Sequence, residues 1–575
     1  MSMEINFRSS GPELWGGIEC TINRIGNVFR DQLADANYYH REDDIETIVG
    51  LGFKRFRYPV LWERHQPGKG GHINWDRAAT DLNLLRRKGI VPIVGLLHHG
   101  SGPAHTDLLD DDFPAKFAGY AAAVASRFPW LEYYTPINEP LTTARFSGLY
   151  GFWYPHHQND NSFLKMLLNQ LKATVLAMQQ IRAVNPHAKL VQTEDLAKTH
   201  STPLLAYQAV FENYRRWLTY DLLCGKVDQN HYLWPYFISE GITEPELSFF
   251  IANTCPPSVI GCNYYLTSER YLDECLDNYP ASTHGGNSRH QYADTAGVRC
   301  NHRSGLKILL DEVWERYRIP VAVTECHLNC TREEQLRWLM ETWETCCDLK
   351  ANHIPVIAVT AWSLLGAHDW NSLLVTRNGH YETGAYDVQG GYLRATALAR
   401  MIKMLATGQP FDHPLLQQPG WWRRIHEPGN VNGRPLLVID DFLFAQACAE
   451  RGIPFLCLSV AEFERNCMMH AAQWLQQTNP WGLVIPGQQF LRTQELLTVA
   501  PHLPLMVVMN GSNRPGPEWM DEPGVLVVQN KSANGMKFVH NAMDLFIDEE
   551  KGLWIFFENQ MKKTRIRKTD FSPVK

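Results

Sequence analysis

Short apolar runs that end in polar or glycine-rich segments recur eight times along the first 425 residues of the chain. They begin at Leu14, Phe53, Ile90, Tyr133, Lys189, Ser258, Ile319 and Pro355. Longer stretches with helical spacing of apolar positions lie between them, among them residues 115–127, 162–184 and 333–350. This alternation is typical of a strand–helix unit repeated eight times. Eight parallel strands with crossover helices close most simply into a (β/α)8 barrel, the TIM barrel, so we predict an α/β fold of this class.

A segment rich in proline, glycine and asparagine, residues 417–434, has no apolar periodicity and predicts a linker. We place a domain boundary close to Pro428, between a barrel of residues 1–425 and a smaller domain of residues 434–575. After Arg434 the chain continues with an apolar run, a helical stretch and a second apolar run, and further β-rich runs begin at Pro480, Pro504 and Gly524. This order predicts a Rossmann-like, doubly wound α/β domain.

Polar and aromatic residues follow the predicted barrel strands, where apolar packing does not require them. They are Arg57, His98, His99, Asn138, Glu139, Asn263, Tyr264, Tyr265, Glu325, Trp362, Asp369 and Trp370. In a (β/α)8 barrel the carboxyl ends of all strands meet at one rim, which carries the active site. Two carboxylates from different strands, Glu139 and Glu325, are what a glycosidase needs, one protonated and one ionised. Arginine and tyrosine beside a carboxylate favour its ionised form, and tryptophan offers a flat face to a sugar ring.

These residues resemble the motifs of family 1 glycoside hydrolases, the β-glucosidase family. The run TPINEP at residues 135–140 is similar to the acid/base signature T-x-N-E-P, and VTE at residues 323–325 to the start of the nucleophile motif [IV]-T-E-N-G. The runs LWGGIECTINR, FRYPVLWER, LLHHGSGP, GCNYY and AWSLLGAHDW resemble further motifs of the family, in the family's order. One short match would be weak, but this ordered series covers the whole predicted barrel.

The resemblance implies a retaining double displacement. Glu139 would be the general acid/base and Glu325 the nucleophile, while Asn138 would bind the sugar 2-hydroxyl. Arg57 and Tyr265 would orient Glu325 and keep it ionised.

The resemblance also implies a sugar pocket with several altered positions. Asn23 stands where the family has a glutamine and Asp369 where it has a glutamate, each one methylene shorter, and His99 replaces a tryptophan. Cys326 and His327 replace the Asn-Gly that follows the nucleophile. These departures put the identity of the sugar in doubt more than the reaction. The expected substrate-binding residues are Asn23, Arg57, His98, Asn138, Asn263, Tyr265, Trp362, Asp369 and Trp370.

The start of the second domain resembles dTDP-4-dehydrorhamnose reductase, a sugar-nucleotide reductase. The glycine-rich turn expected after the first strand is replaced by Asp440 and Asp441, and no glycine occurs before Gly452. Residues 434–575 contain no tyrosine, so the Tyr-x-x-x-Lys pair of that enzyme class is absent. We therefore predict a degenerate domain without oxidoreductase activity, which stabilises the barrel, forms a homo-oligomer or contacts a partner.

The amino-acid composition limits the kinds of partner that we expect the protein to bind. The 575 residues include 61 acidic and 54 basic side chains, a formal charge of −7, so no basic field favours nucleic acid or a membrane surface. The first ten residues lack the apolar core of a signal peptide, and the 13 cysteines are scattered, which predicts a cytoplasmic protein with reduced thiols. Cys326 and Cys330 bracket His327, but this motif lacks the second half of a structural zinc site. We expect a small glycoside substrate, no metal and no cofactor.

Other interpretations remain open at this point. The Asn138–Glu139 pair could be a structural polar cluster, and His98, His99, Trp362 and Trp370 could be core or loop residues. The barrel could bind a sugar or sugar nucleotide without turnover, or transfer glycosyl groups to an acceptor other than water. The protein could also act as a reductase through its second domain.

Overall fold

A computed structural model describes the chain at residues 11–276, 279, 283–300, 303–423, 434–450, 453–489, 496, 498–500, 503–510, 525–530, 539 and 543. The chain divides into two compact units. The first comprises Met1–Leu272, Ala296–Val298 and His302–Gln418, and the second comprises Asp273–Thr295, Arg299–Asn301 and Pro419–Lys575. Because residues 273–295 lie inside the predicted barrel but join the second unit, the domain limits proposed from the sequence stay a prediction.

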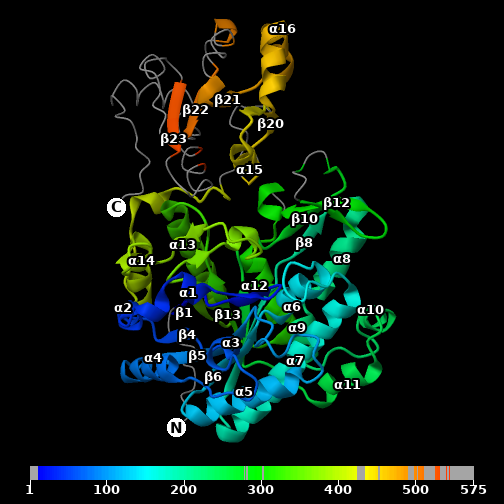
Figure 1. Cartoon of the computed structure of the whole chain (residues 1–575), viewed down its shortest axis with the longest axis vertical. Coiled ribbons are helices and arrows are strands. Elements are labelled where there is room, and N and C mark those ends of the chain that lie inside the picture. The colour runs from blue at the N-terminus through cyan, green and yellow to red at the C-terminus, as the bar shows by residue number, and fades with distance from the viewer. Residues whose placement is uncertain are drawn as a thin grey trace. The chain divides into compact units, whose positions relative to one another are not determined.

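The centre of the first unit is a closed parallel barrel with the strand order β1-β14-β13-β9-β7-β6-β5-β4 (Figure 1). Its strands are β1 (Glu13–Gly17), β4 (Arg55–Pro59), β5 (Val91–His98), β6 (Tyr133–Asn138), β7 (Lys189–Asp195), β9 (Val259–Asn263), β13 (Val321–Cys326) and β14 (Val356–Ala361). Each strand lies in one of the eight predicted apolar runs, and neighbours in the barrel pair in parallel. The predicted (β/α)8 barrel is therefore confirmed.

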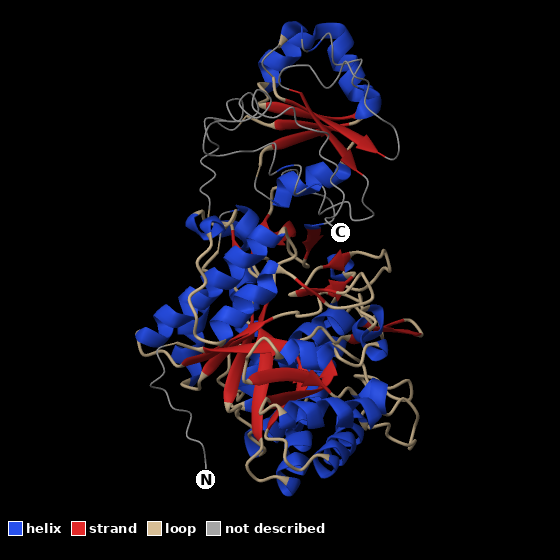
Figure 2. Cartoon of the chain, turned by 90° about the vertical axis from the view of Figure 1, so that its left-hand side faces the viewer, coloured by secondary structure: helices blue, strands red, loops and turns tan. Residues whose placement is uncertain are grey.

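Helices surround the barrel strands (Figure 2). The three longest are α5 (Phe113–Arg127), α7 (Asp160–Val184) and α13 (Arg332–Ala351), which overlap the three predicted helical stretches. Helix α7 begins where the Asn159 side chain accepts the Ser162 backbone N–H, and it buries a stripe with helical spacing that includes Phe163, Leu167 and Leu171. The other helices of this unit are α1 (Gln32–Asp35), α2 (Asp44–Val49), α3 (Trp62–His65), α4 (Asp76–Arg87), α6 (Pro140–Ala144), α8 (Ala206–Arg215), α9 (Leu218–Leu223), α10 (Trp234–Ser239), α11 (Glu244–Ala252), α12 (Leu306–Tyr317) and α14 (Ala397–Ala406).

One apolar layer closes the barrel interior. It consists of Trp15, Ile93, Tyr133, Val191, Val259, Ala322 and Ala358, one buried residue from each of seven strands. Because this layer uses the early positions of most strands, the later positions at the carboxyl ends are left for polar side chains.

Besides the barrel strands, the chain forms further short strands before Arg434. They are β2 (Ile22–Ile25), β3 (Val28–Asp31), β8 (Thr199–Ser201), β10 (Arg270–Asp273), β11 (His284–Gly286), β12 (Gln291–Ala296), β15 (Ala367–His368), β16 (Tyr381–Glu382), β17 (Tyr386–Asp387) and β18 (Arg394–Ala395). The hairpin of β2 and β3 and the antiparallel pair of β15 and β16 carry or flank residues predicted for the sugar pocket. No described helix is long and apolar enough to cross a membrane.

The second unit contains a five-stranded parallel sheet with the order β20-β19-β21-β22-β23. The strands are β19 (Leu436–Ile439), β20 (Phe455–Leu458), β21 (Gly482–Pro486), β22 (Leu505–Asn510) and β23 (Val525–Asn530), with helices α15 (Phe442–Glu450) and α16 (Val460–Thr478). Alternate residues of β19 enter two different apolar clusters, Leu436 and Val438 in one, Leu437 and Ile439 in the other. Both faces of the sheet are thus covered.

Candidate active site

Several of the predicted functional side chains lie together at the carboxyl ends of the barrel strands. Glu325 lies opposite Asn263 in the pairing of β13 with β9, and His98 lies opposite Asn138 in the pairing of β5 with β6. Glu139 directly follows β6. The barrel register therefore brings side chains that are far apart in the sequence to one rim.

The Glu325 carboxylate is held by two donors. Arg57 Nη1 donates to Glu325 Oε1 at 2.9 Å, and the Tyr265 hydroxyl donates to Glu325 Oε2. Arg57 Nη1 also donates to the Thr324 carbonyl at 2.6 Å, which fixes the guanidinium against β13. Burial raises the pKa of Glu325, and the charge of Arg57 and the hydrogen bond from Tyr265 oppose that rise.

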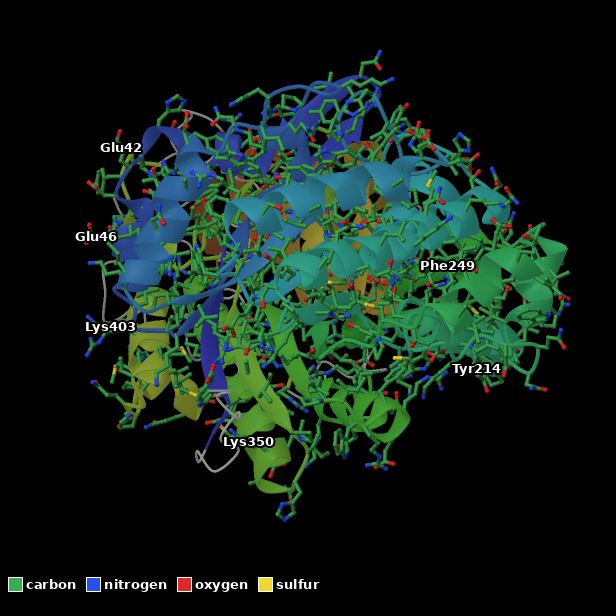
Figure 3. The ribbon with its side chains drawn as sticks, turned by 90° about the horizontal axis from the view of Figure 1, so that it is seen from below. Glu42, Glu46, Tyr214, Phe249, Lys350 and Lys403 are labelled. Atoms are coloured by element: carbon green, nitrogen blue, oxygen red, sulfur yellow. The ribbon has the colours of Figure 1, made fainter. Side chains whose placement is uncertain are left out.

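Surface carboxylates of the same protein behave differently. Glu42 and Glu46 lie at the periphery of the molecule (Figure 3), and the Glu46 side chain is 57% exposed compared with 3% for Glu325. The hydrogen bond from Lys88 lowers the pKa of Glu46. A cation beside a carboxylate lowers the pKa outright at the surface, whereas in the barrel it only offsets burial.

Glu139 has a less polar setting than Glu325. Its Oε1 accepts a hydrogen bond from Asn263 Nδ2 at 2.6 Å, and His99 Nε2 lies 3.8 Å from its Oε2. Burial raises the pKa of Glu139 well above its ordinary value, and the negative charge of Glu325 adds to the effect. Its backbone adopts a left-handed conformation with φ 45°, directly before Pro140 at the start of α6. Such a backbone is uncommon for a residue other than glycine and occurs often at functional sites.

A buried glutamate anchors the helix that follows Glu139. The Glu194 carboxylate accepts the Leu141 and Thr142 backbone N–H groups at 2.9 and 3.3 Å and the Thr219 hydroxyl at 2.8 Å. Burial raises the pKa of Glu194 to about 7, although these hydrogen bonds lower it. Glu194 thereby fixes the first turn of α6 and the backbone at Glu139.

Asn138 joins Arg57 to the two histidines of the rim. Its Oδ1 accepts from Arg57 Nη2 at 2.8 Å and from Thr193 Oγ1 at 2.7 Å, so its Nδ2 lies toward His98 Nε2 and His99 Nε2 at 3.3 and 3.4 Å. Burial lowers the pKa of His98 well below its ordinary value and that of His99 to about 3. Both imidazoles are therefore neutral at physiological pH.

Aromatic rings form the walls beside these polar groups. The Trp362 ring stacks on His98 with a centroid distance of 5.6 Å and an interplanar angle of 7°, and the Arg57 guanidinium lies 4.6 Å from the Trp362 ring. The Trp370 and Trp153 rings lie 5.6 and 5.3 Å from the ring of His99. The site thus combines flat apolar faces with a few directed polar groups, as sugar binding requires.

Comparison with known proteins identifies the family to which this chain belongs. The family described as "Glycosyl hydrolase family 1" matches residues 14–382. The chain belongs to this family. Beta-glucosidase 40 of Arabidopsis thaliana is 30% identical over 144 residues, which are 23% of this chain and 28% of that protein. Beta-glucosidase A of Thermotoga maritima is 25% identical over 193 residues, 32% of this chain and 42% of that protein. The matched regions thus span less than half the length of these curated relatives.

Solved structures share the fold of this chain. A structure titled "Family 1 b-glucosidase from Thermotoga maritima" superposes with a TM-score of 0.56 and 16% identity, covering 70% of this chain and 98% of that one. The AHE enzyme from Alicyclobacillus herbarius superposes with a TM-score of 0.53 and 15% identity, covering 65% and 88%. At this identity the likeness concerns the family 1 barrel fold alone.

Two predicted pocket residues of the family 1 barrel stand outside the hydrogen-bond network around Glu139 and Glu325. Asp369 Oδ1 accepts the backbone N–H groups of Asn378 and His380 at 3.2 and 2.8 Å, so this oxygen holds its own loop. Asn23 is fully buried in β2, and among the described residues its side-chain oxygen and nitrogen have no hydrogen-bond partner.

The sequence interpretation missed two residues of the rim. Trp153 lies in a loop without a motif, and only its ring contacts reveal it. Glu19 comes two residues after the end of β1 and is 5% exposed, with a pKa raised to about 7 by burial. The rule that found the other residues, a polar side chain after a barrel strand, could have found Glu19 as well.

The cysteine and histidine residues after Glu325 behave as structural groups. Burial raises the pKa of Cys326 to about 12, which keeps its thiol protonated. His327 Nε2 lies 3.1 Å from Glu382 Oε2. Of the described residues, those that could bring three metal-ligand atoms together are Asp273, Glu274 and Cys275, in the other unit.

Proposed function

We propose that the barrel is a retaining β-glycoside hydrolase in which Glu325 is the nucleophile and Glu139 the general acid/base. The observation that carries this proposal is the difference between the two buried carboxyl groups. Arg57 and Tyr265 stabilise the anionic form of Glu325, whereas Glu139 receives one amide hydrogen bond and faces the charge of Glu325. One carboxyl group ready to attack and one ready to donate a proton are the two roles of a double displacement.

In the first step the Glu325 carboxylate attacks the anomeric carbon while Glu139 gives its proton to the leaving oxygen. The glycosidic bond breaks and a glycosyl ester forms on Glu325. Esterification removes the negative charge of Glu325, which is one cause of the raised pKa of Glu139. The pKa of Glu139 then falls, which suits its second role as the base that takes a proton from the attacking water.

The other polar residues of the rim would bind the sugar. Asn138 Nδ2 and the neutral His98 are directed hydrogen-bonding groups, while Trp362 and Trp370 offer ring faces. Asn263 ties Glu139 to β9 and to the residue before Glu325, because its Nδ2 donates to Glu139 Oε1 and its Oδ1 accepts from Thr324 Oγ1 at 2.6 Å. The relatives are named as β-glucosidases. Because Asn23 and Asp369 are shorter than their family counterparts, we expect weak activity on simple glucosides and a differently substituted sugar as the substrate.

Intact mass after incubation with a panel of 2-deoxy-2-fluoro glycosides tests the reaction. A retaining enzyme accumulates the glycosyl ester, so the mass should increase by one fluorosugar residue for the preferred sugar. Glu325→Gln should show no increase. Turnover of any glycoside with inversion at the anomeric carbon would reject the mechanism, as would an adduct that persists in Glu325→Gln.

We propose that the second unit is a doubly wound α/β domain that does not bind a dinucleotide. Numbered along the chain, its strand order is 2-1-3-4-5, which reverses direction between β19 and β21, where such folds bind their ligands. A dinucleotide phosphate would need the free N–H groups at the start of α15. The Asp441 carboxylate already accepts the Phe444 backbone N–H at 3.1 Å, and Asp440 places a second acid beside it. A role in stabilising or dimerising the barrel fits this domain better than redox chemistry.

A further inference from the structure

The segment that leaves β1 places a third carboxyl group at the catalytic rim. Glu19 Oε1 accepts the Thr21 backbone N–H at 2.8 Å, and the Glu19 backbone N–H donates to Ser363 Oγ at 2.8 Å. The Trp362 side chain lies close enough to Glu19 to lower the pKa of its carboxyl group slightly, against the effect of burial. Trp362 stacks on His98 and lies against Arg57, so Glu19 is linked through one side chain to the groups around Glu325.

The position of Glu19 is fixed on both sides. The Gly17 carbonyl accepts the Leu364 backbone N–H at 2.9 Å, and the Thr21 carbonyl accepts the Gln32 backbone N–H at 3.1 Å. The segment that carries Glu19 is therefore tied by backbone hydrogen bonds to the loop after β14 and to the start of α1.

The charge of Glu19 is not balanced. Arg57, the cation of this rim, is engaged by Glu325 and Asn138. In the part of the chain that the structure describes, no lysine, arginine or histidine forms an ion pair with Glu19, and the negative charge of Glu325 adds to the rise of its pKa. A buried carboxylate without a cation is costly, and an ammonium group from a ligand would remove that cost.

The same segment offers further unused polar atoms. Thr21 Oγ1 and both side-chain polar atoms of Asn23 are buried and have no hydrogen-bond partner among the described residues. Buried polar atoms are normally satisfied, so these atoms are suited to groups of a bound ligand. Glu19, Thr21 and Asn23 together form a buried polar segment directly after β1.

We propose that Glu19 determines specificity by binding an ammonium group on the sugar, so that the preferred substrate is the glycoside of an amino sugar. This inference rests on the proposed function, because it assumes that the sugar lies between Glu139 and Glu325. A hydroxyl group would serve Glu19 less well, since the Thr21 N–H already donates to Glu19 Oε1. A cation pairs with the carboxylate and offsets the burial that raises the pKa of Glu19 to about 7, which a hydroxyl group does not.

Calorimetric titration, which needs no turnover, is the test. The ligands are the methyl β-glycosides of four glucose derivatives with the amine at C2, C3, C4 or C6, together with methyl β-glucoside. For one position we expect the amine to bind wild-type protein at least about 30-fold more tightly than the glucoside, which corresponds to about 2 kcal/mol. Glu19→Gln should abolish that preference, so that the amine and the glucoside bind this variant with affinities within about 3-fold of each other.

Two further variants keep the test decisive. Glu63→Gln is a matched control, because Glu63 is also a buried glutamate whose pKa burial raises, to about 8, and it should keep the preference. Glu19→Asp, which withdraws the carboxylate by one methylene, should weaken the preference if Glu19→Gln does not fold. No preference at any position, an equal preference at all four, or a preference that survives in Glu19→Gln would overturn the proposal.

The outcomes also separate this inference from the proposed function. Amine selectivity lost in Glu19→Gln, without hydrolysis of any aryl glycoside, would support the role of Glu19 in recognition and reject the hydrolase. Hydrolysis of neutral aryl glycosides without amine selectivity would reject the role of Glu19 and keep the hydrolase.

Discussion

The hydrogen bond from Tyr265 to Glu325 provides a quantitative test of the nucleophile. Tyr265→Phe removes one of the two donors on a buried carboxylate and leaves Glu325 Oε2 without that bond. Arg57 continues to hold Oε1. The anionic form of Glu325 is therefore destabilised relative to the protonated form, and the nucleophile is ionised only at higher pH.

The size of the effect follows from the type of bond. A hydrogen bond to a charged group contributes about 1.5–3 kcal/mol, and 1.36 kcal/mol corresponds to one pH unit, so the acidic limb of the kcat/KM profile should move up by about one to two pH units. Below that limb, Tyr265→Phe should be slower than wild type by about 10- to 100-fold, and on the plateau the loss should be smaller.

The assay is the pH dependence of kcat/KM for an aryl glycoside with an activated leaving group. Such a substrate needs little help from Glu139, so the acidic limb reports the ionisation of Glu325 in the free enzyme. Tyr264→Phe is the matched control, since the Tyr264 hydroxyl donates to another buried carboxylate, Glu269 Oε1, at 2.8 Å. An acidic limb that stays in place in Tyr265→Phe, moves to lower pH, or moves equally in Tyr264→Phe would refute the reasoning.

Four further predictions follow from the site and the second unit. Glu325→Gln should lose turnover on all substrates, whereas Glu139→Gln should lose far more on poor leaving groups than on activated aryl glycosides; wild-type rates in both variants would contradict the assignment. Asn23 should make cellobiose a poor substrate, so efficient cellobiose hydrolysis would count against the altered pocket. Burial raises the pKa of Glu63 from its ordinary 4.5 to about 8, so the folded protein keeps a proton that the unfolded chain releases, and stability falls as the pH rises from 5 to 9. The free energy of unfolding of the wild-type protein should fall by roughly 3–5 kcal/mol over this range, and Glu63→Gln should remove that fall. Melting temperatures of both proteins at pH 5 and pH 9 check this, and an unchanged pH dependence in the variant would exclude a protonated Glu63. Calorimetric titration should find no binding of NADH or NADPH tighter than about 100 μM, roughly −5.5 kcal/mol; tighter binding would mean that residues 434–575 retain a nucleotide site.

The barrel was predictable from the sequence because its signal is local. Each strand is a short apolar run, each crossover helix has its own periodicity, and the order of the runs leaves one simple way to close the sheet. The residues Glu139, Asn263 and Glu325 were predictable for the same reason, since each is a polar residue at the end of an apolar run.

The partners of those residues depend on the tertiary structure. Arg57 bonds both Glu325, 268 residues away, and Asn138, 81 residues away, and such contacts depend on strand register and side-chain rotamers that no local pattern encodes. Asp369 is a second example. Its place in a motif predicts a residue that binds the sugar, and only the folded loop shows that one of its oxygens, Oδ1, accepts backbone N–H groups.

The protonation states were decided by burial. The sequence suggested that Arg57 and Tyr265 keep Glu325 ionised, and the structure adds a desolvation effect that raises the pKa of Glu325, of Glu139 and of the unpredicted Glu19. The sequence by itself determined which residues follow the ends of the barrel strands, because the position of a residue after a strand is a local property, whereas the tertiary structure brings Trp153 to the rim from a loop. Only the tertiary structure decided how much water each carboxyl group loses and which charges face it, because both depend on elements that pack together from across the whole barrel.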